Sequence, residues 1–217
     1  MSRGRAARYD DQREAILTHA ARLFAEHGYP ATSMNQVAQA CGLSKATLYH
    51  YYRDKYALLV SIADGHVTRL EALVEEVQAL QLAPAEELRT LILRIVAEYA
   101  GAQHAHQVLT EDVRFLTEAD RDRILGTERR VVAAFARAIG LWHPAKAEAG
   151  LATPLTMLLF GMMNWLFTWM QPDRGLSHEA IAVIVADLFT GGVNAVRPPP
   201  ADALAPAPSG VEAPLQP

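Results

Sequence analysis

Residues 33–55 read SMNQVAQACGLSKATLYHYYRDK, in which two helix-forming segments flank a glycine. Two short helices, 33–41 and 44–52, are predicted on either side of Gly42, which suits a turn that needs a positive φ. Ala38 is small where two such helices cross closely. Apolar residues stand where a helix-turn-helix must fill the space between its helices: Val37, Cys41, Leu43, Leu48 and Tyr51. The pattern therefore predicts a helix-turn-helix with the Cys41 thiol buried in the packing.

The second of these helices carries the residues that would read DNA. A recognition helix enters the major groove with its N-terminal residues, and Ser44 is placed to cap this one. Lys45 can donate to guanine, whereas Ala46 and Thr47 can contact a thymine methyl group. The predicted DNA-binding residues of this helix are Ser44, Lys45, Ala46, Thr47, Tyr49 and His50.

Phosphate contacts should flank these base contacts, because they fix the register without reading sequence. Ser33 presents a hydroxyl beside the free amides of the first short helix. Lys55 opens the next long helix, where its charge can meet a phosphate, and Tyr49 and His50 can approach the backbone from the side. Any one of these side chains could simply belong to a solvent-exposed face without a DNA contact. The pattern of all of them together favours DNA binding.

Charge divides the chain in the same way. Residues 1–55 carry a formal charge of +3 and the remaining 162 residues carry −7, although the whole chain stands at −4. A basic head on an acidic body is expected when only one domain meets phosphate. One cysteine and no secretory signal predict a cytoplasmic protein. The apolar run 154–170 is too short to span a bilayer, so no membrane partner is expected.

Helical periodicity predicts an all-α fold for the rest of the chain. The expected organisation is a flexible basic arm (1–9), a three-helix DNA-binding domain (10–56), a larger helical domain for ligand binding and dimerisation (57–196) and a disordered, proline-rich tail (197–217). Capping residues, prolines and glycines set the expected bounds. The predicted helices outside the motif are 11–27, 55–80, 85–103, 106–116, 118–141, 154–170 and 178–190, with a loop at 142–152. Thr153 is expected to cap the helix 154–170, and Gly191 and Gly192 are expected to end the last helix.

The segment from Phe24 through AEHGYPATSMNQVAQACGLSKATLYHYYRDKYALL resembles the DNA-binding domain of the TetR family, including its TLYxxYxxK core. The resemblance covers roughly residues 10–60. It implies a homodimer that binds two-fold symmetric, double-stranded operator DNA and acts as a repressor released by a small-molecule effector. It also implies that Asn35, near the start of the first motif helix, contacts a base.

The C-terminal body resembles family members that sense acyl-CoA thioesters, through LTEDVRFL at 109–116, GMMNWLFTWMQPDRGLS at 161–177 and ADLFTGGV at 186–193. Within that group it looks most like the repressor of phenylacetate degradation, whose effector would be phenylacetyl-CoA. A CoA thioester needs an apolar slot and cations near its phosphates. The predicted ligand-binding residues are Arg114, Phe115, Met162, Met163, Trp165, Phe167 and Trp169.

Alternatives stay open for this half of the chain. The Met and Trp residues are equally suited to a core or a dimer contact, and a drug-responsive repressor of an efflux pump fits the same resemblance. An enzyme or carrier on a DNA-binding-like fold has no catalytic motif to support it. His104 and His106 stand near Glu111 and Asp112, but their spacing fits no common zinc pattern, so neither a metal nor a cofactor is expected.

Overall fold

The computed structural model describes residues 2–170 and 175–197, and within these ranges all regular structure is helical. The prediction of an all-α fold is confirmed. The elements are α1 (Ser2–His27), α2 (Met34–Ala40), α3 (Lys45–Tyr51), α4 (Lys55–Ala79), α5 (Pro84–Gly101), α6 (Gln103–Asp112), the 3-10 turn η1 (Val113–Phe115), α7 (Glu118–Trp142), α8 (Pro144–Glu148), α9 (Ala152–Trp169) and α10 (His178–Ala195).

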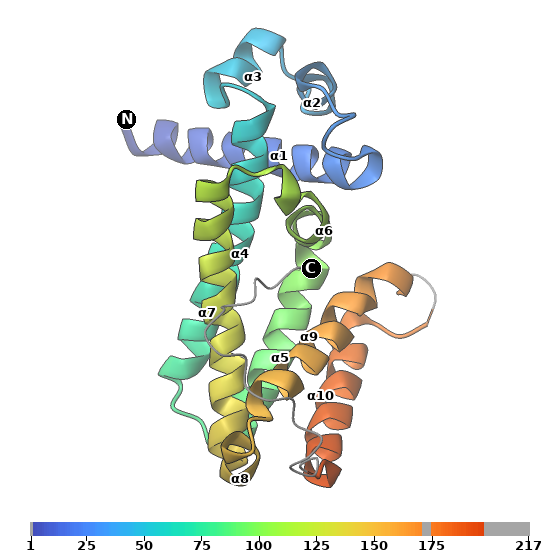
Figure 1. Ribbon diagram of the computed structural model, residues 1–217. Coiled ribbons are helices and arrows are strands. Elements are labelled where there is room, and N and C mark those ends of the chain that lie inside the picture. Colours follow the sequence, from blue (N-terminus) through green and yellow to red (C-terminus); the bar gives the residue numbers. More distant parts are fainter. Residues whose placement is uncertain (1, 171–174, 198–217) are drawn as a thin grey trace.

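The first three helices form a head at one end of the molecule. In Figure 1, α1 lies across the upper end of the long helices, and α2 and α3 stand above it. Five of the described helices, among them α2, α3 and α4, begin with the same device, a side-chain oxygen that accepts from a backbone N–H three residues on. Ser33 Oγ accepts from Gln36 at 3.3 Å, Ser44 Oγ from Thr47 at 3.1 Å, and an Asp54 carboxylate oxygen from Ala57 at 2.7 Å.

The head shares its core with the upper part of the body. This upper core gathers buried side chains from α1 to α4, and α6 and α7 add Val108, Leu109 and Ile124 to it. Helix α6 also packs along α1. The head therefore has no core of its own but shares this one with the upper part of the body.

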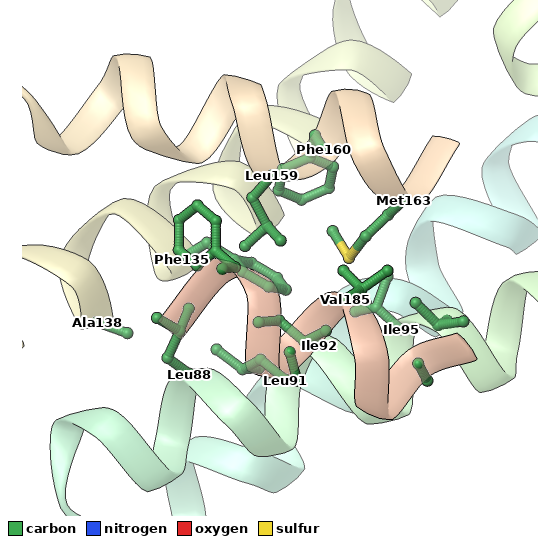
Figure 2. Close-up of a cluster of buried hydrophobic side chains, with 14 of the residues drawn as sticks. Leu88, Leu91, Ile92, Ile95, Phe135, Ala138, Leu159, Phe160, Met163 and Val185 are labelled. Carbon is green, nitrogen blue, oxygen red and sulfur yellow. The ribbon is translucent and has the colours of Figure 1, made fainter. Parts of the chain in front are cut away.

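A second cluster, the lower core, fills the body between α4, α5, α7, α9 and α10. Figure 2 shows Leu88, Leu91 and Ile92 of α5 facing Phe135 of α7 and Leu159 of α9. Phe135 and Phe160 meet edge to face, with their ring centroids 5.0 Å apart. Burying aliphatic and aromatic side chains together in this way supplies most of the free energy that holds the body together.

The first helix is longer than predicted. It begins at Ser2 instead of Asp11, so it includes most of the basic segment 1–9 that was expected to be an arm. Alanine and arginine are strong helix formers, and the segment holds no proline to stop the helix. Of the predicted tail 197–217, only Arg197 lies within the described residues.

Several other boundaries differ from the prediction, including the helix predicted at 106–116, which is α6 followed by η1. The expected loop 142–152 contains α8, which has Pro144 at its first turn and is followed by Gly150 at φ +72°. Helix α9 begins at Ala152, with no side-chain cap from Thr153. Helix α10 continues through the two glycines to Ala195, because Val193 beyond them is buried against the lower core.

For α8, a proline at the start and a glycine just after the end are helix signals that the loop prediction overlooked.

The hydropathy of the described helices bears on membrane insertion. Among residues 2–170 and 175–197, no helix combines the length and apolar character that crossing a bilayer requires.

Candidate nucleic-acid interface and effector region

Helix α3 turns one side to the core and leaves the other to solvent. Leu48 is fully buried between the helices of the head. The predicted base-reading side chains all lie exposed around it: Lys45, Ala46, Thr47, Tyr49 and His50. The Lys45 ammonium lies 5.9 Å from the centroid of the Tyr49 ring. The structure thus brings this predicted set together on one face of a short, capped helix.

The start of α2 presents the second predicted group. Ser33 and Gln36 form a reciprocal capping box, in which the Ser33 backbone N–H donates to Gln36 Oε1 at 2.8 Å. Asn35, one residue beyond Met34, is exposed. The Ser33 hydroxyl is itself exposed but already donates to Gln36 Oε1 at 2.8 Å. A phosphate at Ser33 would therefore compete with the capping box for that proton.

The turn between α2 and α3 has the predicted geometry, with Gly42 at φ +65° and Ala38 buried. Two assignments in the packing change. Tyr52 is buried at the end of α3, whereas Tyr51 is only half-buried, so Tyr52 takes the core position predicted for Tyr51. Cys41 is also half-buried at the edge of the upper core, and its partial burial raises the pKa of the thiol.

Lys55 has a structural role that the sequence did not reveal. Its ammonium donates to the carbonyl oxygens of Tyr29, at 2.6 Å, and Pro30, at 3.0 Å. It also lies 4.5 Å from the centroid of the Tyr29 ring. Burial lowers the pKa of this amine. Lys55 therefore ties the start of α4 to the link between α1 and α2, and a phosphate contact would have to share its ammonium.

Helix α1 braces the recognition helix through aromatic contacts that sequence reasoning missed. Tyr9 stacks on Tyr51 with ring centroids 4.8 Å apart, and the Arg13 guanidinium lies 5.4 Å from the centroid of the Tyr52 ring. The sequence signal that could have predicted these contacts is Tyr9, an aromatic residue in the segment 1–9 that is predicted to be a flexible arm. These contacts set the position of the end of α3 relative to α1.

The predicted ligand-binding residues do not share one place. Arg114 and Phe115 lie in η1 at the junction of head and body, where the Phe115 ring centroid is 5.3 Å from that of Tyr29. Arg114 is exposed, with its guanidinium 4.9 Å from the centroid of the Phe115 ring. Phe115 packs against the upper core, well away from the residues predicted on α9.

The α9 set is itself divided. Met163 is fully buried in the lower core and Met162 packs against it. Trp165 is 67% exposed and Trp169 is 55% exposed. The Phe167 side chain lies outside the described part of the structure. The described residues of the predicted set therefore do not line a single apolar slot in this conformation.

A buried polar cluster lies between α4, α5 and α6, and sequence reasoning missed it. His66 Nε2 and His106 Nδ1 are 3.2 Å apart, and the Tyr99 ring stacks on His106 with centroids 3.7 Å apart. Burial lowers the pKa of His66 to about 3 and that of His106 to about 4. Burial also raises the pKa of the Tyr99 hydroxyl, with a smaller effect from Glu128. All three side chains are therefore neutral at pH 7.

The three residues come from different helices, so no local spacing could have joined them. In the sequence, His106 stands only near His104, Glu111 and Asp112, whose spacing fits no common zinc pattern. Within residues 2–170 and 175–197, no three side chains of His, Cys, Asp or Glu are grouped as a metal site would require.

Three arginines of α7 form ion pairs with α4 and α5. Arg130 pairs with Glu71 at 2.5 Å, and Arg137 pairs with Glu87. Both arginines border a cleft of about 390 Å³ between α4 and α7. Cations are therefore present beside a cavity of the body, although each already has a carboxylate partner.

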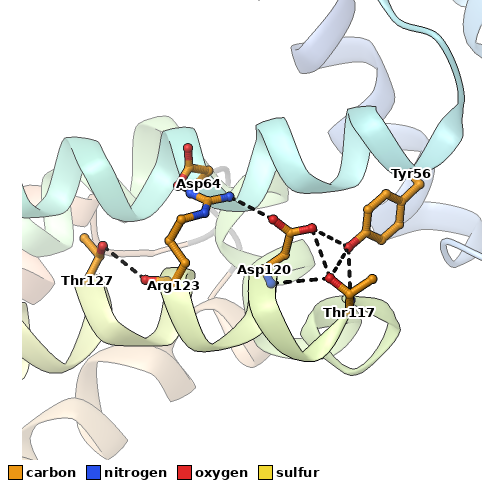
Figure 3. A network of polar contacts seen from close by, with 6 residues as sticks. All are labelled: Tyr56, Asp64, Thr117, Asp120, Arg123 and Thr127. Atoms are coloured by element: carbon orange, nitrogen blue, oxygen red, sulfur yellow. Dashed lines mark hydrogen bonds and ion pairs between the residues drawn. The ribbon is translucent and has the colours of Figure 1, made fainter.

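A polar network joins the start of α4, which follows the head directly, to the start of α7 (Figure 3). The Tyr56 hydroxyl donates to Asp120 Oδ2 at 2.7 Å and accepts from the Thr117 backbone N–H at 3.0 Å. Arg123 then pairs with both Asp120 and Asp64. The Tyr56 and Arg123 hydrogen bonds lower the pKa of Asp120, so this carboxylate stays charged. The network fixes α4 against α7 just below the head.

Two family profiles match the chain. "Bacterial regulatory proteins, tetR family" matches residues 16–62, which include α2 and α3. "Tetracyclin repressor-like, C-terminal domain" matches residues 81–193, which is more than half of the 217 residues. The chain belongs to the TetR family.

Solved TetR-family structures resemble the whole fold. A TetR-family transcriptional regulator from Bordetella parapertussis is 31% identical, covers 85% of this chain and 97% of its own, and superposes with a TM-score of 0.78. AibR, solved in complex with isovaleryl coenzyme A and operator DNA, is 28% identical over 82% of this chain and 97% of its own, with a TM-score of 0.69.

Curated TetR-type relatives match mainly in the head. The HTH-type transcriptional repressor ComR of Escherichia coli is 38% identical over 71 residues, which is 33% of this chain and 33% of ComR. The matched segment thus spans about a third of that relative's length. These relatives are transcriptional regulators, and the expectation of a TetR-family regulator that is not an enzyme is confirmed.

Proposed function

We propose that this TetR-family chain is a dimeric repressor that leaves its operator DNA when a CoA thioester binds to its body. The observation that carries the proposal is the likeness to AibR, a homologue solved with both isovaleryl coenzyme A and operator DNA. The likeness extends over 82% of this chain, so it includes the body as well as the head. Within the CoA thioesters, we propose phenylacetyl-CoA as the effector, controlling genes of phenylacetate catabolism.

The head supports DNA binding on physical grounds. Five exposed side chains on α3 offer donors, acceptors and a methyl-sized contact surface, as major-groove reading requires. The same face holds Lys45 and His50 but no acidic side chain, so phosphates are not repelled there. Ser33, Asn35 and Lys55 flank this face and remain proposed DNA contacts.

The outer faces of α9 and α10 support dimer formation. Large apolar side chains are exposed there in a single protomer, including Leu158 at 67% and Leu188 at 63%. A patch of this kind is costly in water and usually marks an interface. Trp165 and Trp169 belong to the same exposed set, so we propose that they meet the partner protomer and not the acyl group. A second copy of the same two helices would cover the patch.

We propose that the effector enters the body through the cleft between α4 and α7. Arg130 and Arg137 at its border can turn from Glu71 and Glu87 to the CoA phosphates, which form bidentate, charge-assisted pairs with guanidinium as carboxylates do. We propose that the acyl group then lies toward His66, Tyr99 and His106, neutral buried side chains with hydrogen-bonding groups suited to a thioester carbonyl.

Thermal unfolding with a panel of ligands tests the effector. A ligand that binds only the folded chain raises its melting temperature, so phenylacetyl-CoA and isovaleryl-CoA should do so while free CoA should do so less. Gel shift with DNA from upstream of the chain's own gene should show release at the same ligand concentrations. If no CoA thioester raises the melting temperature at millimolar concentration, the effector proposal fails. A response to lipophilic drugs alone would instead favour a repressor of an efflux pump.

A further inference from the structure

A cleft of about 340 Å³ lies where the head meets the body, between α1, α4 and the corner that joins α5 to α6. Its floor is apolar, with Leu17 and Ala21 of α1 facing Ile62 of α4. Thr18 and Ser61 add hydroxyl groups at its walls. The volume falls within the range of pockets that hold small organic ligands.

Two glycines keep this cleft open although the backbone does not need them. Gly65 in α4 and Gly101 at the end of α5 both line the cleft and both have ordinary helical backbone. A Cβ at Gly65 would meet only the end of the Arg69 side chain, at 3.9 Å, and one at Gly101 would meet nothing within 4 Å. Glycine weakens a helix relative to alanine. Neither φ nor close packing requires glycine at these two positions, and the lack of a side chain at both leaves the cleft open.

The charge of the cleft favours a cation. Its ionisable lining is Glu14, Arg69, Glu98 and His104. Arg69 pairs with Glu98 at 3.0 Å, which leaves the carboxylate of Glu14, for which the described residues provide no ion pair. The C-terminal end of α5 and the N-terminal end of α6 both border the cleft, so their opposite partial charges offset each other, and Glu14 carries the preference for a cation.

We propose that this cleft is a second ligand site, which binds a small organic amine with an apolar body. The apolar part would lie on the floor between α1 and α4, and the ammonium group would meet Glu14. The net negative charge of the lining disfavours a CoA thioester, and the site shares no lining residue with the effector cleft between α4 and α7. Because α1 belongs to the head and the α5–α6 corner to the body, an amine bound here would contact both.

Isothermal titration of the full chain with three ligands of one shape tests the proposal. The probes are 2-phenylethylamine, 2-phenylethanol and 3-phenylpropionate, which present a cation, a neutral group and an anion on similar bodies. The amine should bind at least about tenfold more tightly than either of the other two. Equal affinity for all three, or no heat from the amine at about 10 mM, would overturn the proposal.

Substitutions at the cleft locate the binding. Gly65→Leu should fill the space and abolish amine binding, whereas Gly126→Leu should not, since Gly126 is another helical glycine whose Cβ would meet only an arginine end, at 3.7 Å. Thr18→Phe blocks the cleft from the side of α1 and should also abolish amine binding. It replaces Gly65→Leu as the test if the Gly65→Leu chain does not fold. Amine binding that survives a folded blocking variant would show that the site lies elsewhere and contradict the proposal.

A charge substitution separates the ammonium contact from the apolar one. Glu14→Gln should weaken the amine about fivefold or more and leave the alcohol unchanged. The exposed Glu148, in α8 at the far end of the body, provides the matched control Glu148→Gln, which should change neither. Equal weakening by both substitutions would mean that the amine responds only to net charge, and the assignment of Glu14 would fall.

Discussion

Single residues of α3 carry the sequence-reading proposal, and their roles divide by what each already contacts. Thr47 Oγ1 lies 2.7 Å from Ser44 Oγ, so it shares a hydrogen bond with the cap of its own helix. Tyr49 is 43% exposed and its hydroxyl is available to DNA. Local spacing was enough to predict this face, because all its members lie within two turns of one helix.

Replacing both Thr47 and Tyr49 by alanine should reduce specific operator binding. Each good base contact discriminates by about 1–3 kcal/mol, so the double variant should bind the operator at least about tenfold more weakly. Binding to unrelated DNA should change little, since that depends on phosphate contacts. Fluorescence anisotropy with both DNAs measures this, with the exposed Thr68→Ala of α4 as control. An unchanged operator affinity would remove these residues from the reading surface.

Lys55→Met should lower the stability of the chain. The substitution removes two charge-assisted hydrogen bonds, to the carbonyl oxygens of Tyr29 and Pro30, and the free energy of unfolding should fall by about 1–3 kcal/mol. Urea unfolding followed by circular dichroism measures it. A phosphate contact would show differently, as a loss of about one unit in the salt dependence of DNA affinity. Unchanged stability with a shallower salt dependence would make Lys55 a DNA contact alone.

At the scale of elements, caps and periodicity predicted most helices, and tertiary packing decided where several of them end. Ser44 caps α3 as predicted, and Ser33 and Ser177 cap α2 and α10 in the same way. Helix α10 continued past its glycines because burying Val193 outweighs their helix propensity, and that burial depends on a partner helix distant in sequence. The His66, Tyr99 and His106 cluster could not be predicted for the same reason.

Tyr56→Phe should loosen the join between α4 and α7. The phenol oxygen makes hydrogen bonds to the Asp120 carboxylate and the Thr117 backbone N–H, and their loss should lower the free energy of unfolding by about 1–2 kcal/mol. Urea unfolding is the measurement, and Tyr49→Phe, at an exposed tyrosine, is the matched control. A change in Tyr56→Phe no larger than in the control would mean that water replaces these bonds without cost.

At the scale of the whole molecule, the buried histidines should make the fold sensitive to acid. Their pKa values lie at about 3 and about 4 in the folded chain, below the ordinary value of 6.5. The unfolded chain therefore binds protons that the folded chain does not. The free energy of unfolding should fall as the pH drops below about 6.5, by up to about 1.4 kcal/mol per pH unit for each histidine, until the folded pKa values are reached.

Urea unfolding at pH 7.0 and pH 5.0 checks this dependence. His66→Gln removes one of the two groups and should reduce the loss of stability between the two pH values, whatever its stability at pH 7. His104→Gln, at an exposed histidine, should leave the loss as it is in the unaltered chain. An equal loss in His66→Gln and the unaltered chain would contradict the assignment to this cluster.

The proposed dimer predicts a change of mass from one substitution. Leu188→Glu places a charge in the exposed apolar face of α10, which should disfavour a second copy and yield a monomer in light scattering. Leu141→Glu is the matched control, because Leu141 is 54% exposed at the end of α7. A Leu188→Glu chain that keeps the mass of a dimer would move the interface elsewhere.

The upper core, finally, determines how the head can be studied. Val108, Leu109 and Ile124 of the body are buried against the helices of the head. A fragment ending near residue 56 would expose that apolar surface to water and lose its hydrophobic stabilisation. The DNA-binding head is therefore not expected to fold as an independent domain. It should fold and unfold in one cooperative transition with at least α6 and the first turns of α7, and fusion or truncation experiments need to retain them.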